Sequence, residues 1–206
     1  KVLSKRDDGY HNIRTGITFI NLYDTIEIEQ SNSLSIKYTG NFSPKNGYYS
    51  DCIILRTMNF LNKKNDLSLN IKIQKNIPVE GGLGSASTNA ASLILTLEEM
   101  NLIKKEDPKT YAILGADIPC FLFKKNCLTL GIGDIVVPQI YPKYYFLLVK
   151  PNFNNSTKNM YSLLDFNSLS KEITTDDFKI NDEDFGNDFE KIVFEKNKKF
   201  SQIMEF

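Results

Sequence analysis

The 206-residue chain carries 25 Lys and Arg residues against 25 Asp and Glu residues, so its formal net charge is zero. Hydrophobic residues make up 41% of the chain and charged residues 24%, an ordinary balance for a globular protein of one large or two small domains. A nonspecific nucleic-acid-binding protein needs a basic footprint that this chain lacks, and no apolar run reaches the roughly 18–20 residues of a membrane span. We therefore expect neither nucleic acid nor a membrane as a partner.

Cysteine and histidine usage gives no sign of a metal site. Cys52, Cys120 and Cys127 are odd in number and show neither CxxC nor Cys/His spacing, and the chain has one histidine. Residues 1–7 lack the apolar segment of a secretory signal. We expect reduced thiols and a cytoplasmic protein.

The first half of the chain begins with strand patterns. Residues 16–29 mix an apolar run with alternation, which predicts one or two strands broken near Tyr23 and Asp24. Residues 34–38 alternate again, and residues 41–50, rich in Asn, Ser, Pro and Gly, predict a loop. Residues 52–62 predict a helix with one apolar face, formed by Ile53, Ile54, Thr57, Met58 and Leu61.

A strand, a glycine turn and a helix follow in that order. Residues 67–74 alternate apolar and polar side chains, which is typical of a half-buried strand. The turn lies at residues 81–84, and we expect an apolar helix from Ala90 to Met100. This order allows loop amides and a helix N-terminus to hold phosphate.

The second half of the chain is less regular. Residues 128–137 predict a strand, a turn and a second strand, and the apolar run at residues 144–149 predicts a buried strand. The composition becomes polar and acidic from Ser168 onward, and residues 188–206 have helical apolar spacing. Pro138 and Pro142 bracket a short connector, so we expect a domain boundary near residue 142.

The strongest chemical signal is the segment 78–91, which reads PVEGGLGSASTNAA. Its glycines allow the backbone to approach a polyphosphate and to adopt positive φ angles. Ser87, Thr88 or Asn89 can cap the following helix, which leaves other amides facing an anion. The segment lacks the Gly-Lys-Ser/Thr of a Walker A loop and the third glycine of a dinucleotide fingerprint. The alternative is a glycine turn that merely links strand to helix.

The same segment resembles the phosphate-binding motif of the GHMP kinases, named after galactokinase, homoserine kinase, mevalonate kinase and phosphomevalonate kinase. Two further stretches resemble one branch of that family, the diphosphocytidyl-methylerythritol kinases. Residues 8–11 (DGYH) with 22–25 (LYDT) resemble its substrate-side segment, and residues 115–119 (GADIP) with 131–134 (GIGD) resemble its catalytic segment. The three occur in the family's order, and a looser match continues through residues 157–161 and 187–190.

The resemblance implies roles for particular residues. Asp117 would be the catalytic base, which orients or deprotonates the attacking hydroxyl in phosphoryl transfer; on the sequence alone, an aspartate that caps the next element is equally reasonable. Tyr10, His11 and Tyr161 would contact the cytosine of the substrate, although a structural role is the plainer interpretation of a single histidine and core packing an alternative for Tyr161. The residues assigned to ATP are Pro78, Gly81, Gly82, Leu83, Gly84, Ser85, Ala86, Ser87 and Thr88.

Several positions depart from the family pattern. The family has a strand with a charge-neutralising lysine just before the position of Lys1, and a glycine-rich motif beyond Phe206, so we expect an incomplete chain. Glu80 stands where the family has a small residue, Ser85 and Ala86 replace glycines, and Cys52 leaves contacts to the nucleotide base in doubt. No metal ligand can be assigned.

The resemblance implies an α+β fold of two domains: an N-terminal domain (residues 1–142) like the second domain of ribosomal protein S5, and a partial C-terminal α+β domain (residues 143–206). It implies a kinase that uses ATP and Mg²⁺ to phosphorylate the 2-hydroxyl of a cytidyl-diphosphate methylerythritol in the non-mevalonate isoprenoid pathway. Such an enzyme would work in a bacterial cytoplasm or a plastid stroma, as a monomer or homodimer. Alternatives are a homoserine- or mevalonate-type kinase, a non-catalytic phosphate-binding relative, and a nucleic-acid-binding protein of similar domain shape.

Overall fold

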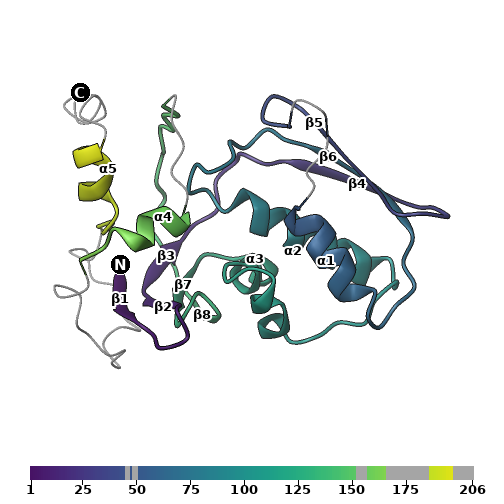
Figure 1. Ribbon diagram of the computed structural model, residues 1–206, viewed down its shortest axis with the longest axis horizontal. Coiled ribbons are helices and arrows are strands. Elements are labelled where there is room, and N and C mark those ends of the chain that lie inside the picture. The colour runs from purple at the N-terminus through teal and green to yellow at the C-terminus, as the bar shows by residue number, and fades with distance from the viewer. Residues whose placement is uncertain (45–46, 48–50, 152–156, 166–185, 197–206) are drawn as a thin grey trace.

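The computed structural model describes residues 1–44, 47, 51–151, 157–165 and 186–196. Within these residues the chain forms eight strands, five α-helices and one 3-10 helix, η1 (Pro108–Ile113). Figure 1 shows helices α1 and α2 with strands β4–β6 at one end of the molecule, and β1 with helices α4 and α5 at the other. The mixed α+β architecture expected from the sequence is confirmed. The domain boundary near residue 142 stays a prediction.

The largest sheet contains the strands that the alternating patterns predict. β6 (Leu69–Gln74) lies between β4 (Thr25–Gln30), which is antiparallel to it, and β5 (Ser35–Thr39), which is parallel. Alternate residues of β6 point into the core, and Leu69, Ile71 and Ile73 are buried. This burial confirms the predicted half-buried strand.

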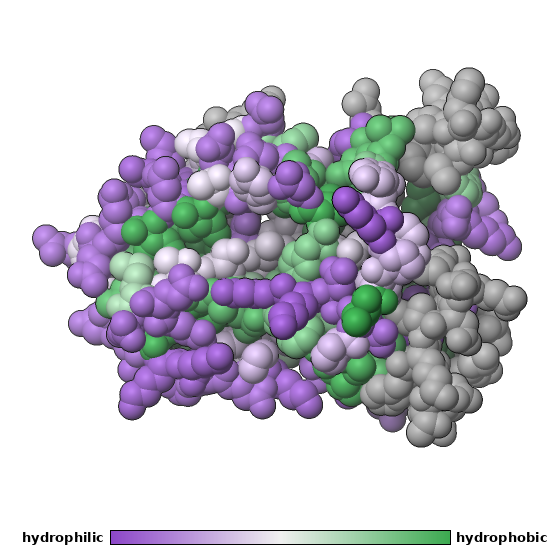
Figure 2. All heavy atoms as spheres, turned by 180° about the vertical axis from the view of Figure 1, so that it is seen from behind, coloured by the Kyte–Doolittle hydropathy of each residue, from purple (hydrophilic) through white to green (hydrophobic). Residues whose placement is uncertain are grey.

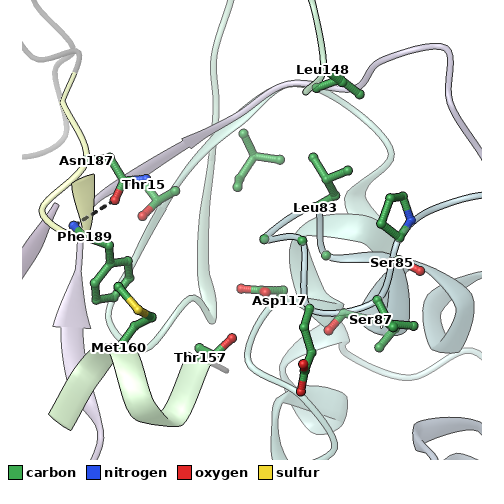
Figure 3. A pocket seen from close by; sticks show the side chains of 18 of the residues that line it. Thr15, Leu83, Ser85, Ser87, Asp117, Leu148, Thr157, Met160, Asn187 and Phe189 are labelled. Carbon is green, nitrogen blue, oxygen red and sulfur yellow. Dashed lines mark hydrogen bonds between the residues drawn. The ribbon is translucent and has the colours of Figure 1, made fainter. Parts of the chain in front are cut away.

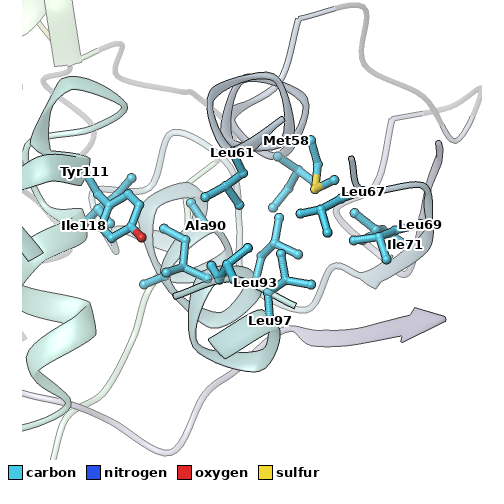
Figure 4. Close-up of a cluster of buried hydrophobic side chains, with 14 of the residues drawn as sticks. Met58, Leu61, Leu67, Leu69, Ile71, Ala90, Leu93, Leu97, Tyr111 and Ile118 are labelled. Atoms are coloured by element: carbon cyan, nitrogen blue, oxygen red, sulfur yellow. The ribbon is translucent and has the colours of Figure 1, made fainter. Parts of the chain in front are cut away.

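Two helices supply the other side of that core. α1 (Ile53–Leu61) buries Ile54, Thr57, Met58 and Leu61, and α2 (Ser85–Glu99) adds alanine, leucine and isoleucine side chains. Figure 4 shows these side chains meeting those of β6 in one cluster, with Tyr111 and Ile118 at its edge. Because Ile118 opens helix α3 (Ile118–Phe123), this core also fixes the helix that follows Asp117.

Two smaller sheets connect this core to the N-terminus. β1 (Val2–Lys5) pairs antiparallel with β2 (His11–Ile13), a hairpin that the sequence patterns did not indicate. β3 (Thr15–Ile17) pairs with β7 (Cys127–Leu130), which pairs with β8 (Ile135–Pro138), all antiparallel. The predicted break near Tyr23 and Asp24 and the strand–turn–strand at 128–137 are both confirmed.

The predicted buried strand at residues 144–149 is wrong. These residues form no strand, and Tyr145 and Leu147 are about nine-tenths exposed. An apolar run favours a strand only if neighbouring strands cover its faces, and among the described residues no strand pairs with this segment.

On the face turned away from the viewer of Figure 1, hydrophilic side chains prevail at the rim and hydrophobic ones show between them (Figure 2).

The C-terminal part contributes two short helices, α4 (Thr157–Ser162) and α5 (Glu190–Lys196). The helical spacing predicted at residues 188–206 is thus present at its start, and residues 197–206 lie outside the described part. The polar segment from Ser168 lies mostly outside it as well, up to residue 185. The two helices lie beside β1 in Figure 1, and the backbone amide of Val2 donates to the Asp188 carboxylate.

Candidate active site

One cleft of about 1780 Å³ collects most of the residues that the sequence singles out. Its lining comes from segments far apart in the chain: β2 and β3, the turn before α2, the residue before α3, and the C-terminal helices. The predicted site residues on its surface are Pro78, Gly81, Gly82, Leu83, Gly84, Ser85, Ala86, Ser87, Asp117 and Tyr161. Thr88, Tyr10 and His11 are not among its lining residues.

The glycine turn adopts the conformation that its composition suggests. Glu80, Gly82 and Gly84 all have positive φ angles, of 54°, 70° and 65°. A Cβ atom built on Gly84 would lie 2.6 Å from Cζ of Phe121, so this position needs glycine both for its backbone and for its close approach to α3. The turn thus brings the start of α2 next to the helix that carries Asp117 at its beginning.

Helix α2 begins five residues earlier than predicted. Its N-cap is Gly84, without a side-chain capping bond, so the expectation that Ser87, Thr88 or Asn89 caps the helix is wrong. The Thr88 hydroxyl instead donates to the Gly84 carbonyl at 3.0 Å, as hydroxyls inside helices do. Because no side chain caps the helix, its first amides and the positive end of its dipole are left for an anion in the cleft.

Asp117 occupies the N-cap position of α3 but makes no side-chain capping bond. The capping role considered from the sequence therefore does not use its carboxylate. In Figure 3 the Asp117 side chain lies between the loop that carries Leu83 and the helix that carries Thr157. Asp117 is exposed to water at the surface of the cleft, and the desolvation of its carboxyl by the protein around it raises the pKa of Asp117 above its ordinary value.

An ion pair that the sequence analysis missed lies beneath the loop. Lys75 and Asp24 are almost completely buried, and the Lys75 ammonium donates hydrogen bonds to the Asp24 carboxylate and the Ser85 hydroxyl. The sequence does contain a signal for it. Lys75 continues the alternation of Leu69, Ile71 and Ile73, so period two places it on the buried face of the strand.

Two of the expected substrate-side residues, His11 and Tyr161, form an aromatic group with Phe189, and of these three Tyr161 and Phe189 line the other end of the cleft. The His11 ring stacks on Tyr161 with centroids 4.6 Å apart, and Phe189 meets Tyr161 edge-on at 5.0 Å. Burial, and secondarily the charge of Lys5, lower the pKa of His11. Tyr10 is half exposed and lies outside the cleft lining. His11 and Tyr161 thus come together, whereas Tyr10 does not join them.

The described residues offer no ready-made metal centre. No group of three or more His, Cys, Asp or Glu side chains among them could hold a metal ion. In the same residues no helix is long and apolar enough to cross a membrane.

Comparison with known proteins gives a consistent picture. Residues 53–139 match the model of the GHMP kinases N terminal domain. The chain is 32% identical over 210 aligned residues to a 4-diphosphocytidyl-2-C-methyl-D-erythritol kinase of Francisella tularensis subsp. holarctica, an alignment that covers 99% of this chain and 75% of the relative. It is 35% identical over 165 residues to the protein of the same name from Ruthia magnifica, covering 77% and 57%.

The fold also matches a solved structure. A crystal structure of a 4-(cytidine 5'-diphospho)-2C-methyl-D-erythritol kinase superposes with a TM-score of 0.71. The match covers 98% of this chain and 75% of the other, with 21% sequence identity. At this identity the likeness shows the fold, and the sequence relatives show the family.

Proposed function

Because the chain belongs to the GHMP kinases, and within them to the family of 4-diphosphocytidyl-2-C-methyl-D-erythritol kinases, we propose that it transfers the γ-phosphate of ATP to the 2-hydroxyl of that cytidyl alcohol. The observation that carries this proposal is the cleft, because the glycine loop and Asp117 line it together. A phosphate donor and a carboxylate that accepts the hydroxyl proton must meet in one place for this reaction.

The nucleotide would bind at the glycine loop. Amides around residues 82–86 and the start of α2 provide donors and a positive helix end for the phosphates. Mg²⁺ would come with the nucleotide, held mainly by phosphate oxygens. The chain offers oxygen donors for this ion in the carboxylate of Glu80 in the loop, the hydroxyl of Ser87 in the first turn of α2 and the carboxylate of Asp117 just before α3.

Asp117 would act on the acceptor. The hydroxyl oxygen attacks the γ-phosphorus, the bond to the β-phosphate oxygen breaks, ADP leaves, and the hydroxyl proton passes to the Asp117 carboxylate. The cytidyl end of the acceptor would lie toward Tyr161 and His11 at the far side of the cleft. A pyrimidine ring suits this place because aromatic side chains offer faces for stacking.

A phosphoryl-transfer assay with ATP and the cytidyl alcohol tests the proposal. The wild-type protein should transfer phosphate, and Asp117→Asn should lower kcat by about 10²–10⁴-fold, the usual contribution of a general base. The matched control is Asp66→Asn, which changes an exposed carboxyl outside the cleft. Near-normal turnover of Asp117→Asn would remove Asp117 from the mechanism.

Ligand protection tests the acceptor separately. A cytidine diphosphate derivative should raise the melting temperature, whereas homoserine and mevalonate should leave it unchanged, since neither carries a ring for the aromatic end of the cleft. Protection by mevalonate or homoserine alone would instead favour another GHMP kinase activity.

A further inference from the structure

The buried pair of Lys75 and Asp24 lies where the glycine loop begins and ends. Lys75 follows β6, and the loop runs from there to Ser85, the first residue of α2. The Lys75 side chain is 4% exposed and that of Asp24 is 1% exposed. Charges so far from water are costly unless hydrogen bonds satisfy them, so this pair needs further partners and the structure provides them.

Each oxygen of the Asp24 carboxylate contacts a different end of the loop. Oδ1 accepts the backbone amides of Asn76 at 2.7 Å and Ile77 at 2.9 Å, which precede the glycines. Oδ2 accepts the Ser85 hydroxyl and the Asn89 amide, each at 3.0 Å, and both belong to α2. Lys75 donates to this same oxygen and to Ser85. One carboxylate therefore joins the two ends of residues 78–84.

Apart from the close approach of Gly84 to Phe121, the composition of the loop between these ends favours conformational freedom. Three of its seven residues have positive φ angles, and glycines allow many alternative conformations. A phosphate-binding loop works only when its amides point at the ligand before it arrives, because ordering them on binding would cost affinity. Holding both ends at one point reduces the conformations open to the residues between them.

The pair also compensates the negative charge of Asp24, which would otherwise repel an anion in the cleft. Lys75, Ser85 and Asn89 line the cleft, so an uncompensated Asp24 carboxylate beside them would repel a polyphosphate. Burial alone would raise the pKa of Asp24, but hydrogen bonds from Lys75, Ile77, Asn89 and Asn76 outweigh it and lower this pKa. Asp24 thus stays ionised, and Lys75 neutralises it.

We propose that Asp24, Lys75, Ser85 and Asn89 form a clasp that holds the glycine loop in its phosphate-binding conformation. These are positioning residues, which act through the loop amides and not on the reacting atoms. Of these four residues, Ser85 is the one that departs from the family pattern, which has glycine at this position. The inference rests on the proposed function for its ligand, which is the polyphosphate of a nucleoside triphosphate.

The test uses Ser85→Ala and, independently, Asn89→Ala, each of which removes one hydrogen bond to Asp24. We expect the KM for ATP to rise by about tenfold, the usual cost of a lost hydrogen bond to a charged group, while the KM for the cytidyl alcohol stays within twofold. Hydrogen exchange of the backbone amides of residues 78–84 should become faster without ligand. Thr57→Val, which removes a buried hydroxyl outside the cleft, is the matched control.

The outcomes separate this inference from the proposed function. If neither variant changes the ATP KM or the loop exchange beyond the Thr57→Val control, the clasp does not position the loop. Equal rises in both substrate KM values would indicate general loosening and would also overturn the inference. If the wild-type protein transfers no phosphate, the proposed function fails, whereas loop exchange and binding of a non-hydrolysable ATP analogue still test the clasp.

Discussion

Asp117 has the two properties that a base for a hydroxyl needs, a place in the cleft and a pKa raised by burial. A higher pKa makes a carboxylate a stronger proton acceptor, but it also means that protonation begins at a higher pH. We expect kcat/KM to fall with decreasing pH through a pKa above the ordinary 3.8. A profile that stays flat down to pH 3.8 or below, with the fold intact by circular dichroism, would contradict this assignment.

The pKa of Asp24 is shifted in the opposite direction, downward, and this shift links the stability of the protein to pH. Hydrogen bonds lower its pKa in the folded protein, so its contribution is fully present above the ordinary pKa of 3.8 and is lost as pH falls through the lowered value. Asp24→Asn leaves Lys75 buried without its counter-charge, and we expect a loss of about 3–5 kcal/mol in unfolding free energy at neutral pH. Urea unfolding measures it, with Asp51→Asn as the control for an exposed carboxyl. A loss below that of the control would contradict the importance of the pair.

At the scale of elements, Gly84 joins the glycine loop to α3. Gly84→Ala should destabilise the protein for two reasons. The left-handed backbone costs about 1–2 kcal/mol for a residue with a Cβ atom, and that Cβ atom would clash with the Phe121 ring. Gly9→Ala is the matched control, because Gly9 also has a positive φ but a Cβ there meets nothing within 4 Å. If Gly84→Ala and Gly9→Ala lowered the unfolding free energy by the same amount in denaturant unfolding, Phe121 would move aside without an energetic cost.

The elements also show what a sequence pattern can predict. Period two placed Leu69, Ile71 and Ile73 on one face because that strand buries one side only, and the α+β fold followed from such local patterns together with the family motifs. The prediction of a buried strand at residues 144–149 failed because burial depends on neighbouring strands, which the apolar pattern does not specify. Likewise, the start of α2 at Ser85 depends on Gly84 as a cap, whereas hydroxyl residues suggested a later start.

The candidate site was predictable only in part for a related reason. The glycine loop and the segment 115–119 around Asp117 are short motifs, and they resemble the family because they occur together and in the family's order. The pairing of Asp24 with Lys75 spans 51 positions of sequence and belongs to no such motif. Asp24 lies in the segment 22–25 that resembles the substrate side of the family, yet the fold places it beneath the loop.

At the scale of the whole molecule, residues near the N-terminus and residues of the described C-terminal segments line the cleft together. His11 comes from the N-terminal hairpin, Tyr161 from α4 and Phe189 from the segment before α5, so this aromatic trio joins parts that lie far apart in sequence. The centroid distance of 4.6 Å leaves no space for another ring between His11 and Tyr161. A cytosine would therefore stack outside this pair or separate its members.

The trio should link stability to recognition of the acceptor. Tyr161→Ala removes both ring contacts, each worth about 0.5–1.5 kcal/mol beyond buried area, so it should lower the melting temperature and raise the KM for the cytidyl alcohol while the KM for ATP changes little. Tyr161→Phe keeps the ring and should behave like the wild type in both measurements. Tyr145→Ala, at a tyrosine about nine-tenths exposed, is the control for losing an aromatic side chain. If Tyr161→Ala matched this control in melting temperature, the trio would not hold the N-terminal hairpin to α4. An unchanged KM for the cytidyl alcohol would show that the cytosine does not bind at Tyr161.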